Sequence, residues 1–345
     1  MESLSKGELT DALSADTLSR NRSSEIADPV ADDLEAEESS EAQLQRTWTL
    51  MEEALRRGGR KPIYGVDERQ DWGEFRFDPR IRKRGKASVA MFLLNNVTTT
   101  PERGAVVKKR SLGDKLRLCR GEPFVRQNAT AYCSGVLVRS NIVLTAGHCI
   151  QNRISASGTT PSRREVHFVF GYFAKPDNEF GLTEFEPSRV FRARKVLARK
   201  FDEAKGVDWA VVELDRPVPS EIASPFTSFS EQPVEQGEGV YVIGYPSGLP
   251  VKYAPGAKVR SVEKEKYFVA NLDAFGGNSG SPVFSARTHS LVGILVRGRA
   301  DYVKDRRKNC RRAFVCPTTG CAGEHVMRIE KIDFSEALRQ CEKCD

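Results

Sequence analysis

The chain reads Leu144-Thr-Ala-Gly-His-Cys149, Asp208-Trp-Ala-Val-Val-Glu-Leu214 and Phe275-Gly-Gly-Asn-Ser-Gly-Ser-Pro282 at three separate places. In chain order, these stretches supply a histidine, an aspartate and a serine. A serine hydroxyl is a weak nucleophile at neutral pH. It needs an imidazole to accept its proton and a carboxylate to fix the tautomer of that imidazole. We therefore take His148, Asp208 and Ser279 as the candidate catalytic residues.

The residues beside Ser279 are small, which allows the backbone to approach a substrate closely. The amides of Gly277 and Ser279 are the candidate donors to the oxyanion that develops when a hydroxyl attacks a carbonyl. In comparable sites, the loss of one such donor costs about 3–4 kcal/mol. The third stretch therefore predicts both a nucleophile and an oxyanion hole.

Each motif alone has a plainer structural interpretation. A histidine before a cysteine is more often a packed core residue than a base, and an aspartate at the start of a strand is usually a cap or a surface charge. A Gly-x-Ser-x-Gly-like run is often only a turn. Three motifs in the expected order make coincidence a poor explanation. The remaining alternative is a binding protein that has the same scaffold without the chemistry.

These residues resemble the chymotrypsin/trypsin superfamily of serine proteases over roughly residues 63–332. The resemblance implies an all-β fold of two six-stranded antiparallel β-barrels, with the active site in the cleft between them. It also implies a disulfide between Cys133 and Cys149 that clamps the histidine loop. The activity implied is that of a serine endopeptidase acting on protein or peptide substrates without a metal or another cofactor.

Within the superfamily, the chain is similar to the bacterial branch that includes glutamyl endopeptidases. Three segments carry this similarity: Ile63-Tyr-Gly-Val-Asp-Glu-Arg69, Gly244-Tyr-Pro-Ser-Gly-Leu-Pro250 and Gly277-Asn-Ser-Gly-Ser-Pro282. Two positions depart from trypsin. Asn278 replaces the aspartate that pairs with the new N-terminus after activation, and Val296 replaces a serine that supports the catalytic aspartate. The resemblance therefore does not extend to trypsin's activation switch.

The specificity pocket is expected to involve Asp273, Val296, Arg297 and Gly298. Asp273 lies six residues before Ser279, where trypsin has the aspartate that accepts substrate Arg or Lys. Leu295 replaces the histidine with which glutamyl endopeptidases hold a substrate carboxylate, so glutamate specificity is not expected. Cleavage after Arg or Lys is one interpretation of Asp273. The other is a structural carboxylate that caps a turn.

Between these motifs, short β-branched and aromatic runs alternate with turn residues every ten or so positions, which is typical of an all-β barrel or sandwich. The predicted strands are Ala87–Leu94, Ser134–Val138, Ile142–Leu144, Val166–Phe170, Ala210–Leu214, Val240–Ile243, Tyr267–Ala270 and Leu291–Val296. A short C-terminal helix is predicted from Asp333 to Cys341. We expect a protease domain over residues 61–332, with a helical, cysteine-bearing tail over 333–345.

Residues 1–60 are predicted to form an acidic, largely disordered leader with one helix over 44–57. They contain 14 Asp/Glu and 7 Lys/Arg, a net charge of −7, whereas the whole 345-residue chain has a net charge of +7. Such a leader fits either a shielding prosegment or a solvated tail. Arg57, Arg60 and Lys61 are candidate cleavage sites at its end. No nucleic-acid-binding signature accompanies the basic body, and no apolar run approaches the ~20 residues of a membrane span.

The eight cysteines favour disulfides and an oxidising compartment, so a secreted or periplasmic protein is expected. The polar start Met1-Glu-Ser-Leu-Ser-Lys-Gly is not a signal peptide, which leaves the location open. Cys119 needs a partner among the C-terminal cysteines Cys310, Cys316, Cys321, Cys341 and Cys344. Together with His325, the first three of these also have gaps that suit a zinc site.

Overall fold

Strands form most of the regular structure in the computed structural model, which describes residues 63–339 except 77, 101–103, 151–165 and 299–300. These residues fall within one compact unit, Leu50–Asp345. The predicted leader, its helix over 44–57 and its basic junction lie outside the described residues, as do Cys341 and Cys344. The predicted all-β class is confirmed for the part that is described.

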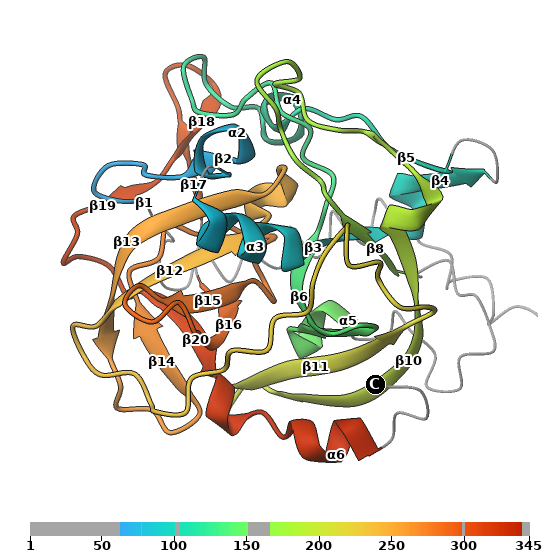
Figure 1. Ribbon diagram of the computed structural model, residues 1–345. Helices are drawn as coiled ribbons and strands as arrows, with labels where there is room; N and C mark the ends of the chain where they lie inside the picture. Colours follow the sequence, from blue (N-terminus) through green and yellow to red (C-terminus); the bar gives the residue numbers. More distant parts are fainter. Residues whose placement is uncertain (1–62, 77, 101–103, 151–165, 299–300, 340–345) are drawn as a thin grey trace, which may run out of the picture. The chain divides into compact units, whose positions relative to one another are not determined.

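The first barrel is closed by six antiparallel strands in the order β10-β11-β7-β6-β3-β8 (Figure 1). Strand β8 returns to β10 and completes the ring, with Phe191 opposite Phe168. The strands are β3 (Ser88–Leu93), β6 (Cys133–Arg139), β7 (Ile142–Thr145), β8 (Val166–Phe170), β10 (Val190–Asp202) and β11 (Val207–Leu214).

The second barrel also closes on six antiparallel strands, in the order β12-β15-β16-β20-β14-β13, because β13 pairs again with β12. A short strand, β2 (Gln70–Asp71), is added to the outer side of β13. The barrel strands are β12 (Gly239–Gly244), β13 (Lys252–Ser261), β14 (Tyr267–Ala270), β15 (Pro282–Ser285), β16 (Leu291–Arg297) and β20 (Glu324–Arg328). The predicted pair of six-stranded barrels is therefore confirmed.

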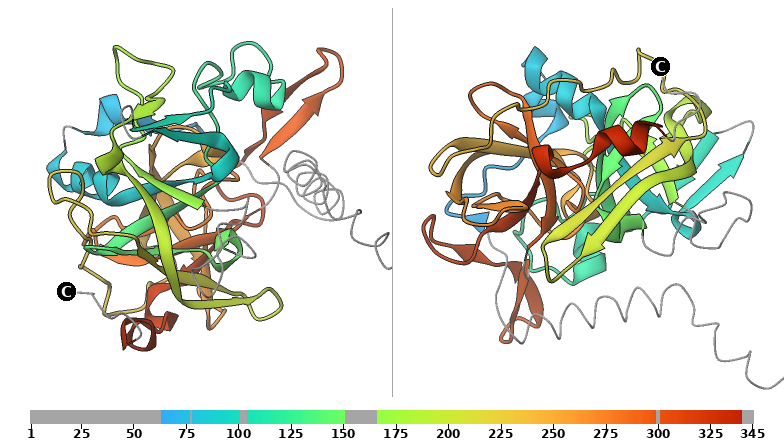
Figure 2. Two further views of the ribbon diagram at one scale, coloured as in Figure 1. Left: turned by 90° about the vertical axis from the view of Figure 1, so that its right-hand side faces the viewer. Right: turned by 90° about the horizontal axis from the view of Figure 1, so that it is seen from below.

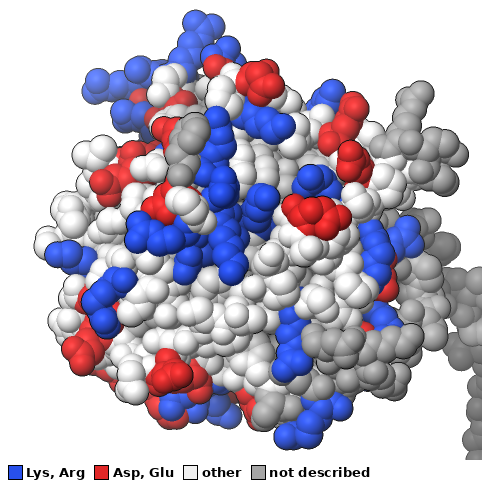
Figure 3. Space-filling model, viewed as in Figure 1, with Lys and Arg blue, Asp and Glu red and all other residues white. Residues whose placement is uncertain are grey.

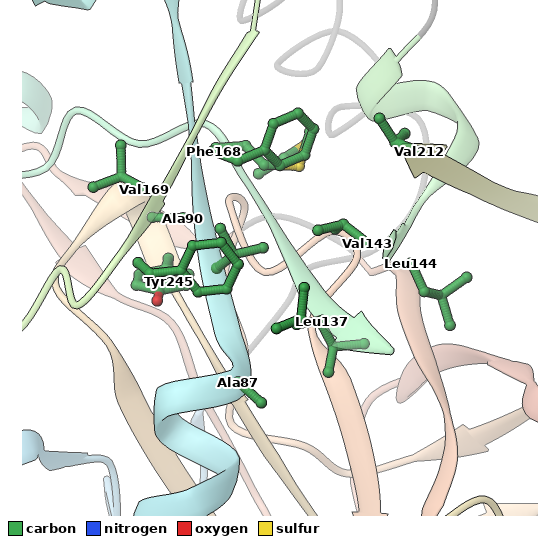
Figure 4. Close-up of a cluster of buried hydrophobic side chains, with 14 of the residues drawn as sticks. Ala87, Ala90, Leu137, Val143, Leu144, Phe168, Val169, Val212 and Tyr245 are labelled. Atoms are coloured by element: carbon green, nitrogen blue, oxygen red, sulfur yellow. The ribbon is translucent and has the colours of Figure 1, made fainter. Parts of the chain in front are cut away.

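The core of the first barrel is formed by the side chains that its strands point inward. Phe168, Val143 and Leu137 are fully buried there (Figure 4). The same cluster continues to Tyr245, which follows β12 of the second barrel. The Tyr245 hydroxyl donates to the carbonyl of Ser88 in β3 at 3.0 Å. This buried contact links the two barrels.

Smaller elements surround the barrels (Figures 1 and 2). Strand β1 (Ile63–Tyr64) pairs in parallel with β19 (Val315–Cys316). The antiparallel hairpin of β17 (Tyr302–Asp305) and β18 (Cys310–Ala313) is separate from the barrel sheets. A third small sheet contains β4 (Val97–Thr100), β5 (Gly104–Val107) and β9 (Glu184–Phe185). The helices are α2 (Trp72–Phe75), α3 (Pro79–Ala87), α4 (Leu112–Leu116), α5 (Gly147–Ile150) and α6 (Phe334–Arg339). Among the described residues, none of the helices has the length and apolar character of a membrane span.

The predicted strands all occur, with ends that differ by a few residues, and α6 lies within the predicted tail helix. Several elements were not predicted, and β10 and α3 show why. Strand β10 is thirteen residues long but buries few of its side chains, because its middle and end carry exposed Arg and Lys. Helix α3 has little apolar periodicity; Asp78 caps its start and Pro79 occupies its first turn.

Candidate active site

His148 and Asp208 meet on the first barrel. His148 lies in the short helix α5 after β7, and Asp208 lies at the start of β11. The Nδ1 atom of His148 is 2.6 Å from Oδ2 of Asp208, and the backbone amide of His148 donates to Oδ1 at 3.0 Å. Nδ1 therefore carries the hydrogen in this pairing, which leaves Nε2 as the acceptor. The aspartate side chain is 7% exposed and the histidine 33% exposed, so Asp208 is shielded while His148 faces solvent.

Ser279 comes from the second barrel, in the turn before β15. Its backbone carbonyl accepts from the amide of Ser134 in β6 at 2.8 Å. The Sγ atom of Cys149 lies 3.6 Å from that carbonyl and 3.7 Å from Nε2 of His148. The serine turn and the imidazole thus touch the same sulfur atom. The three sequence motifs come together where the two barrels meet.

The predicted oxyanion donors are free amides. Within the described part of the chain, the amides of Gly277 and Ser279 have no acceptor, although those of Asn278, Gly280 and Ser281 each have one. The carbonyls before the two free amides are fixed: that of Gly276 accepts from the Ser247 amide, and that of Asn278 accepts from the Ser281 amide. The N–H and C=O groups of a trans peptide point in opposite directions. Both free amides therefore point away from the hydrogen bonds that the carbonyls of Gly276 and Asn278 accept.

Sequence reasoning missed the residues that hold this turn. Asp301, just before β17, accepts from the Gly276 amide through Oδ2 at 2.7 Å. The Tyr302 ring lies 5.1 Å from the Phe275 ring, and its hydroxyl is 2.8 Å from Oγ of Ser247. Ser247 was part of a quoted motif, but no sequence signal distinguished Asp301 or Tyr302.

Ser134 is a second residue that the sequence did not single out. Its Oγ donates to the carbonyl of Gly277 at 2.8 Å and accepts from the amide of Tyr245 at 3.2 Å. Its amide bonds to Ser279, as described above, and its side chain is fully buried. Ser134 therefore anchors the serine turn of the second barrel to β6 of the first. Its place directly after Cys133 was visible, but its role was not.

Asp273 is buried and already accepts hydrogen bonds. Its Oδ1 accepts from the amide of Tyr64 at 2.8 Å and its Oδ2 from the amide of Glu68 at 3.5 Å. Burial is the main reason that the pKa of Asp273 rises from 3.8 to about 6, while the two amides act against this rise. The guanidinium of Arg69 also lowers this pKa slightly. The carboxylate therefore fastens residues 64–68 to the second barrel.

The other predicted pocket residues extend from the end of β16. The amide of Gly280 donates to the carbonyl of Leu295 at 2.7 Å, and the amide of Leu295 donates to the carbonyl of Ser281 at 2.9 Å. Val296, Arg297 and Gly298 follow this contact directly, so they lie beside the serine turn. Val296 is buried, whereas Arg297 is half-buried and reaches Glu203 in the β10–β11 turn at 3.5 Å.

Asn278 is buried and faces the inside of the turn. Its Oδ1 accepts from the Ser281 hydroxyl at 3.1 Å. The amide of Ile63, in contrast, donates to the carbonyl of Phe314 at 2.9 Å. Asn278 thus supports its own turn, and the segment that begins at Ile63 is held elsewhere.

The described cysteines form three disulfides, Cys119–Cys310, Cys133–Cys149 and Cys316–Cys321. The bridge expected beside His148 is confirmed, and Cys119 has its partner in the C-terminal part. Because Cys310, Cys316 and Cys321 are all bonded as disulfides, they do not supply thiolates for a zinc site. Three disulfides agree with an extracellular or periplasmic protein.

Two closed six-stranded antiparallel barrels, with His148 and Asp208 on one and Ser279 on the other, define the chymotrypsin-like fold. Residues 133–294 match the family model described as trypsin-like peptidase domain. Over these residues the chain is similar to trypsin-like peptidases, which are proteases, and the two barrels agree with that similarity. A search of curated proteins finds no match.

Several solved structures are similar to this chain. One is a Glu endopeptidase in complex with MPD, with 14% identity and a TM-score of 0.45, covering 81% of this chain and 100% of its own. Human heparin binding protein has 11% identity and a TM-score of 0.45, covering 77% of this chain and 92% of its own. An inactive form of Rv3671c from M. tuberculosis has 14% identity and a TM-score of 0.40, covering 81% of this chain and 96% of its own.

Proposed function

We propose that this protein is a serine endopeptidase that hydrolyses peptide bonds through an acyl-enzyme on Ser279. Nε2 of His148 takes the proton from the Ser279 hydroxyl as Oγ attacks the substrate carbonyl, and later gives it to the leaving amine. Asp208 holds the imidazole and stabilises its positive form. The amides of Gly277 and Ser279 bind the oxyanion. Water then hydrolyses the acyl-enzyme.

The observation that carries this proposal is the 2.6 Å contact between Nδ1 of His148 and Oδ2 of Asp208. It fixes the tautomer that leaves Nε2 as a base. The Sγ atom of Cys149 lies 3.7 Å from that nitrogen and 3.6 Å from the carbonyl oxygen of Ser279, so the serine turn is close to the imidazole. The free amides of Gly277 and Ser279 lie in the same turn. The closeness of these groups supports the assignment of a base, a nucleophile and an oxyanion site.

A fluorophosphonate probe tests the proposal, because it reacts only with an activated serine. We expect the wild-type protein to be labelled on Ser279, and Ser279→Ala to remain unlabelled. His148→Ala and Asp208→Asn should each lower peptide turnover at least ~10³-fold with the fold intact by circular dichroism. Ser228→Ala, at an exposed serine remote from the motifs, is the control and should label normally.

The alternative is a catalytically silent binding protein on the same scaffold. Near-normal peptidase activity in Ser279→Ala would show that the nucleophile is assigned wrongly. A folded wild-type protein that neither labels nor cleaves a broad peptide library would instead favour the silent scaffold.

Cleavage after Arg or Lys is the finer part of the proposal, with Asp273 as the counter-charge. A substrate cation would have to share this carboxylate with the amides of Tyr64 and Glu68. A peptide-library cleavage profile should then show Arg or Lys before the cleaved bond, and Asp273→Asn should reduce that preference. If the wild-type profile shows no such preference, Asp273 serves only to hold residues 64–68.

We also propose that residues 1–60 are a prosegment of a secreted zymogen, removed near Arg57, Arg60 or Lys61. An exposed junction of this kind is where proteases cut. Incubation of the full-length protein and of Ser279→Ala, followed by N-terminal sequencing, tests the idea. Cleavage of the active form alone indicates self-processing, and equal processing of both forms excludes it. Full activity in the uncleaved chain would exclude the prosegment role.

A further inference from the structure

The β17–β18 hairpin concentrates positive charge at the molecular surface. Six exposed basic residues on it and beside it form what we call the basic hairpin patch: Arg120, Lys304, Arg306, Arg307, Lys308 and Arg312. The one acidic residue within the hairpin, Asp305, is used locally. Its Oδ1 accepts from the amides of Arg307 and Lys308, and its Oδ2 lies 3.5 Å from Arg312. The hairpin therefore keeps a large excess of positive charge (Figure 3).

Most of these charges have no ion-pair partner among the residues that the structure describes. Over the described ranges, Arg120, Lys304, Arg306, Arg307 and Lys308 form no ion pair. A second basic surface on α3 differs, because Arg80 there pairs with Asp78 at 3.0 Å. Like charges held close together repel one another, and an added anionic ligand relieves that repulsion.

The hairpin is held in place at the end that carries Cys310. The disulfide Cys119–Cys310 joins it to the segment after α4. Backbone bonds of 2.8 Å run from the Cys119 amide to the carbonyl of Arg311 and from the Arg311 amide to the carbonyl of Arg117. These bonds place Arg120 next to the hairpin. The patch is thus a fixed surface projecting from the body of the molecule (Figure 2, left, in orange).

The base of the hairpin lies at the candidate oxyanion hole. Asp301 accepts from the amide of Gly276, and the Tyr302 ring packs against that of Phe275, so β17 begins next to the serine turn. Its four residues span about 13 Å at about 3.3 Å per residue, and the exposed charges lie along and beyond that span. An extended substrate also advances about 3.3 Å per residue. Side chains roughly four to six positions from the cleaved bond are therefore within reach of the patch.

The geometry points to the basic hairpin patch as a secondary substrate-binding surface for acidic side chains that flank the cleaved bond. This inference rests on the proposed peptidase function and specifies its substrate class. A peptide seated in the cleft presents its flanking carboxylates at high effective concentration, so several weak exposed pairs act together. Arginine suits this role because its planar guanidinium can bind a carboxylate with two parallel hydrogen bonds.

The test uses two peptides with the same cleavable core, one flanked by four glutamates and the other by four glutamines. For the full chain we expect kcat/KM to be roughly tenfold higher for the glutamate peptide at low salt, because each exposed pair contributes little alone. The ratio should fall toward one at about 1 M NaCl, where the screening length is about 3 Å. Arg306→Glu with Arg307→Glu should bring the ratio to one or below.

Arg82→Glu with Lys83→Glu, on exposed positions of α3, is the matched control and should keep the ratio near that of the wild type. If both peptides are cleaved equally by the wild-type protein, this inference is wrong but the peptidase assignment stands. If neither peptide nor any library member is cleaved, even after removal of residues 1–60, the proposed function itself fails. Competition by heparin or DNA that depends on Arg306 and Arg307, with a ratio of one for the peptides, would make the patch a polyanion surface instead.

Discussion

At the scale of single residues, the candidate site depends on where backbone groups point. Gly277 has φ of +97°, a region that favours glycine, and Gly280 has φ of +85°. A Cβ atom on Gly280 would come 2.1 Å from the carbonyl oxygen of Ser134, so the two barrels could not approach as closely. The nucleophile motif therefore needs its glycines for backbone direction and for close contact between the barrels.

Gly277→Ala should disrupt the oxyanion turn. Its Cβ would lie 2.7 Å from the carbonyl oxygen of Tyr245 and 2.9 Å from the amide of Gly248. We expect a loss of about 1–3 kcal/mol in the free energy of unfolding, together with a much slower reaction of Ser279 with a fluorophosphonate. Gly237→Ala is the control, since φ there is +84° but the added Cβ meets nothing within 4 Å. Equal losses in both variants would refute the role of close packing at Gly277.

Asp273→Asn should change how stability depends on pH. Because burial raises the pKa of Asp273 to about 6 in the folded state, its contribution to stability is fully present below pH 3.8 and is lost as pH rises through 6. Between pH 4 and pH 7, the stability of the wild type should fall relative to Asp273→Asn by about 2 kcal/mol. Urea unfolding of both proteins at the two pH values measures this. A constant difference would mean that the carboxyl group is not perturbed.

At the scale of elements, the sequence predicted strands that are buried along most of their length. Strand β8 is buried at every residue and has the predicted bounds, whereas β10 carries exposed basic residues and gave no such signal. The triad could be predicted because each member lies in a recognisable motif. Asp301 and Ser134 could not, because they act on backbone groups 25 and 143 residues away and nothing in the adjacent sequence identifies those partners.

Lys252 in β13 should be the main anchor of the segment that carries β2 and α2. Its Nζ lies 2.5 Å from Oδ1 of Asp71 and donates to Oε1 of Gln127 at 2.7 Å, with a side chain only 1% exposed. Removing one member of a buried pair leaves the other uncompensated, so Lys252→Ala should cost about 3–5 kcal/mol in the free energy of unfolding.

Chemical denaturation of Lys252→Ala and of Lys205→Ala provides the comparison. Lys205 pairs with Asp202 at 3.3 Å, but its side chain is 78% exposed, so its loss should cost little. If the two variants unfold at the same denaturant concentration, the buried pair contributes no more than an exposed one.

At the scale of the whole molecule, the two barrels hold different parts of one candidate site. His148 and Asp208 belong to the first barrel and Ser279 to the second. The contacts between the barrels therefore control their alignment. Ser134 bonds two residues of the serine turn, and Tyr245 bonds Ser88 across the same boundary.

Ser134→Ala should have a larger effect on kcat than on the free energy of unfolding. The change removes the hydroxyl that bonds the carbonyl of Gly277 and the amide of Tyr245, two groups that are then left without that partner. We expect a cost of about 1–3 kcal/mol in the free energy of unfolding. We also expect kcat to fall with little change in KM, because the oxyanion donors lose their alignment. A change confined to KM would place Ser134 outside the alignment of the turn.

The bridge between Cys119 and Cys310 spans a sequence separation of 191 residues. A single backbone cut anywhere between these positions leaves one cysteine on each product, so the two pieces stay covalently joined. The protein therefore stays one covalent molecule even when its main chain is cut within that interval. A nicked sample should migrate as one species on a non-reducing gel and as two after reduction, and a two-chain form of this protein would still be a single molecule.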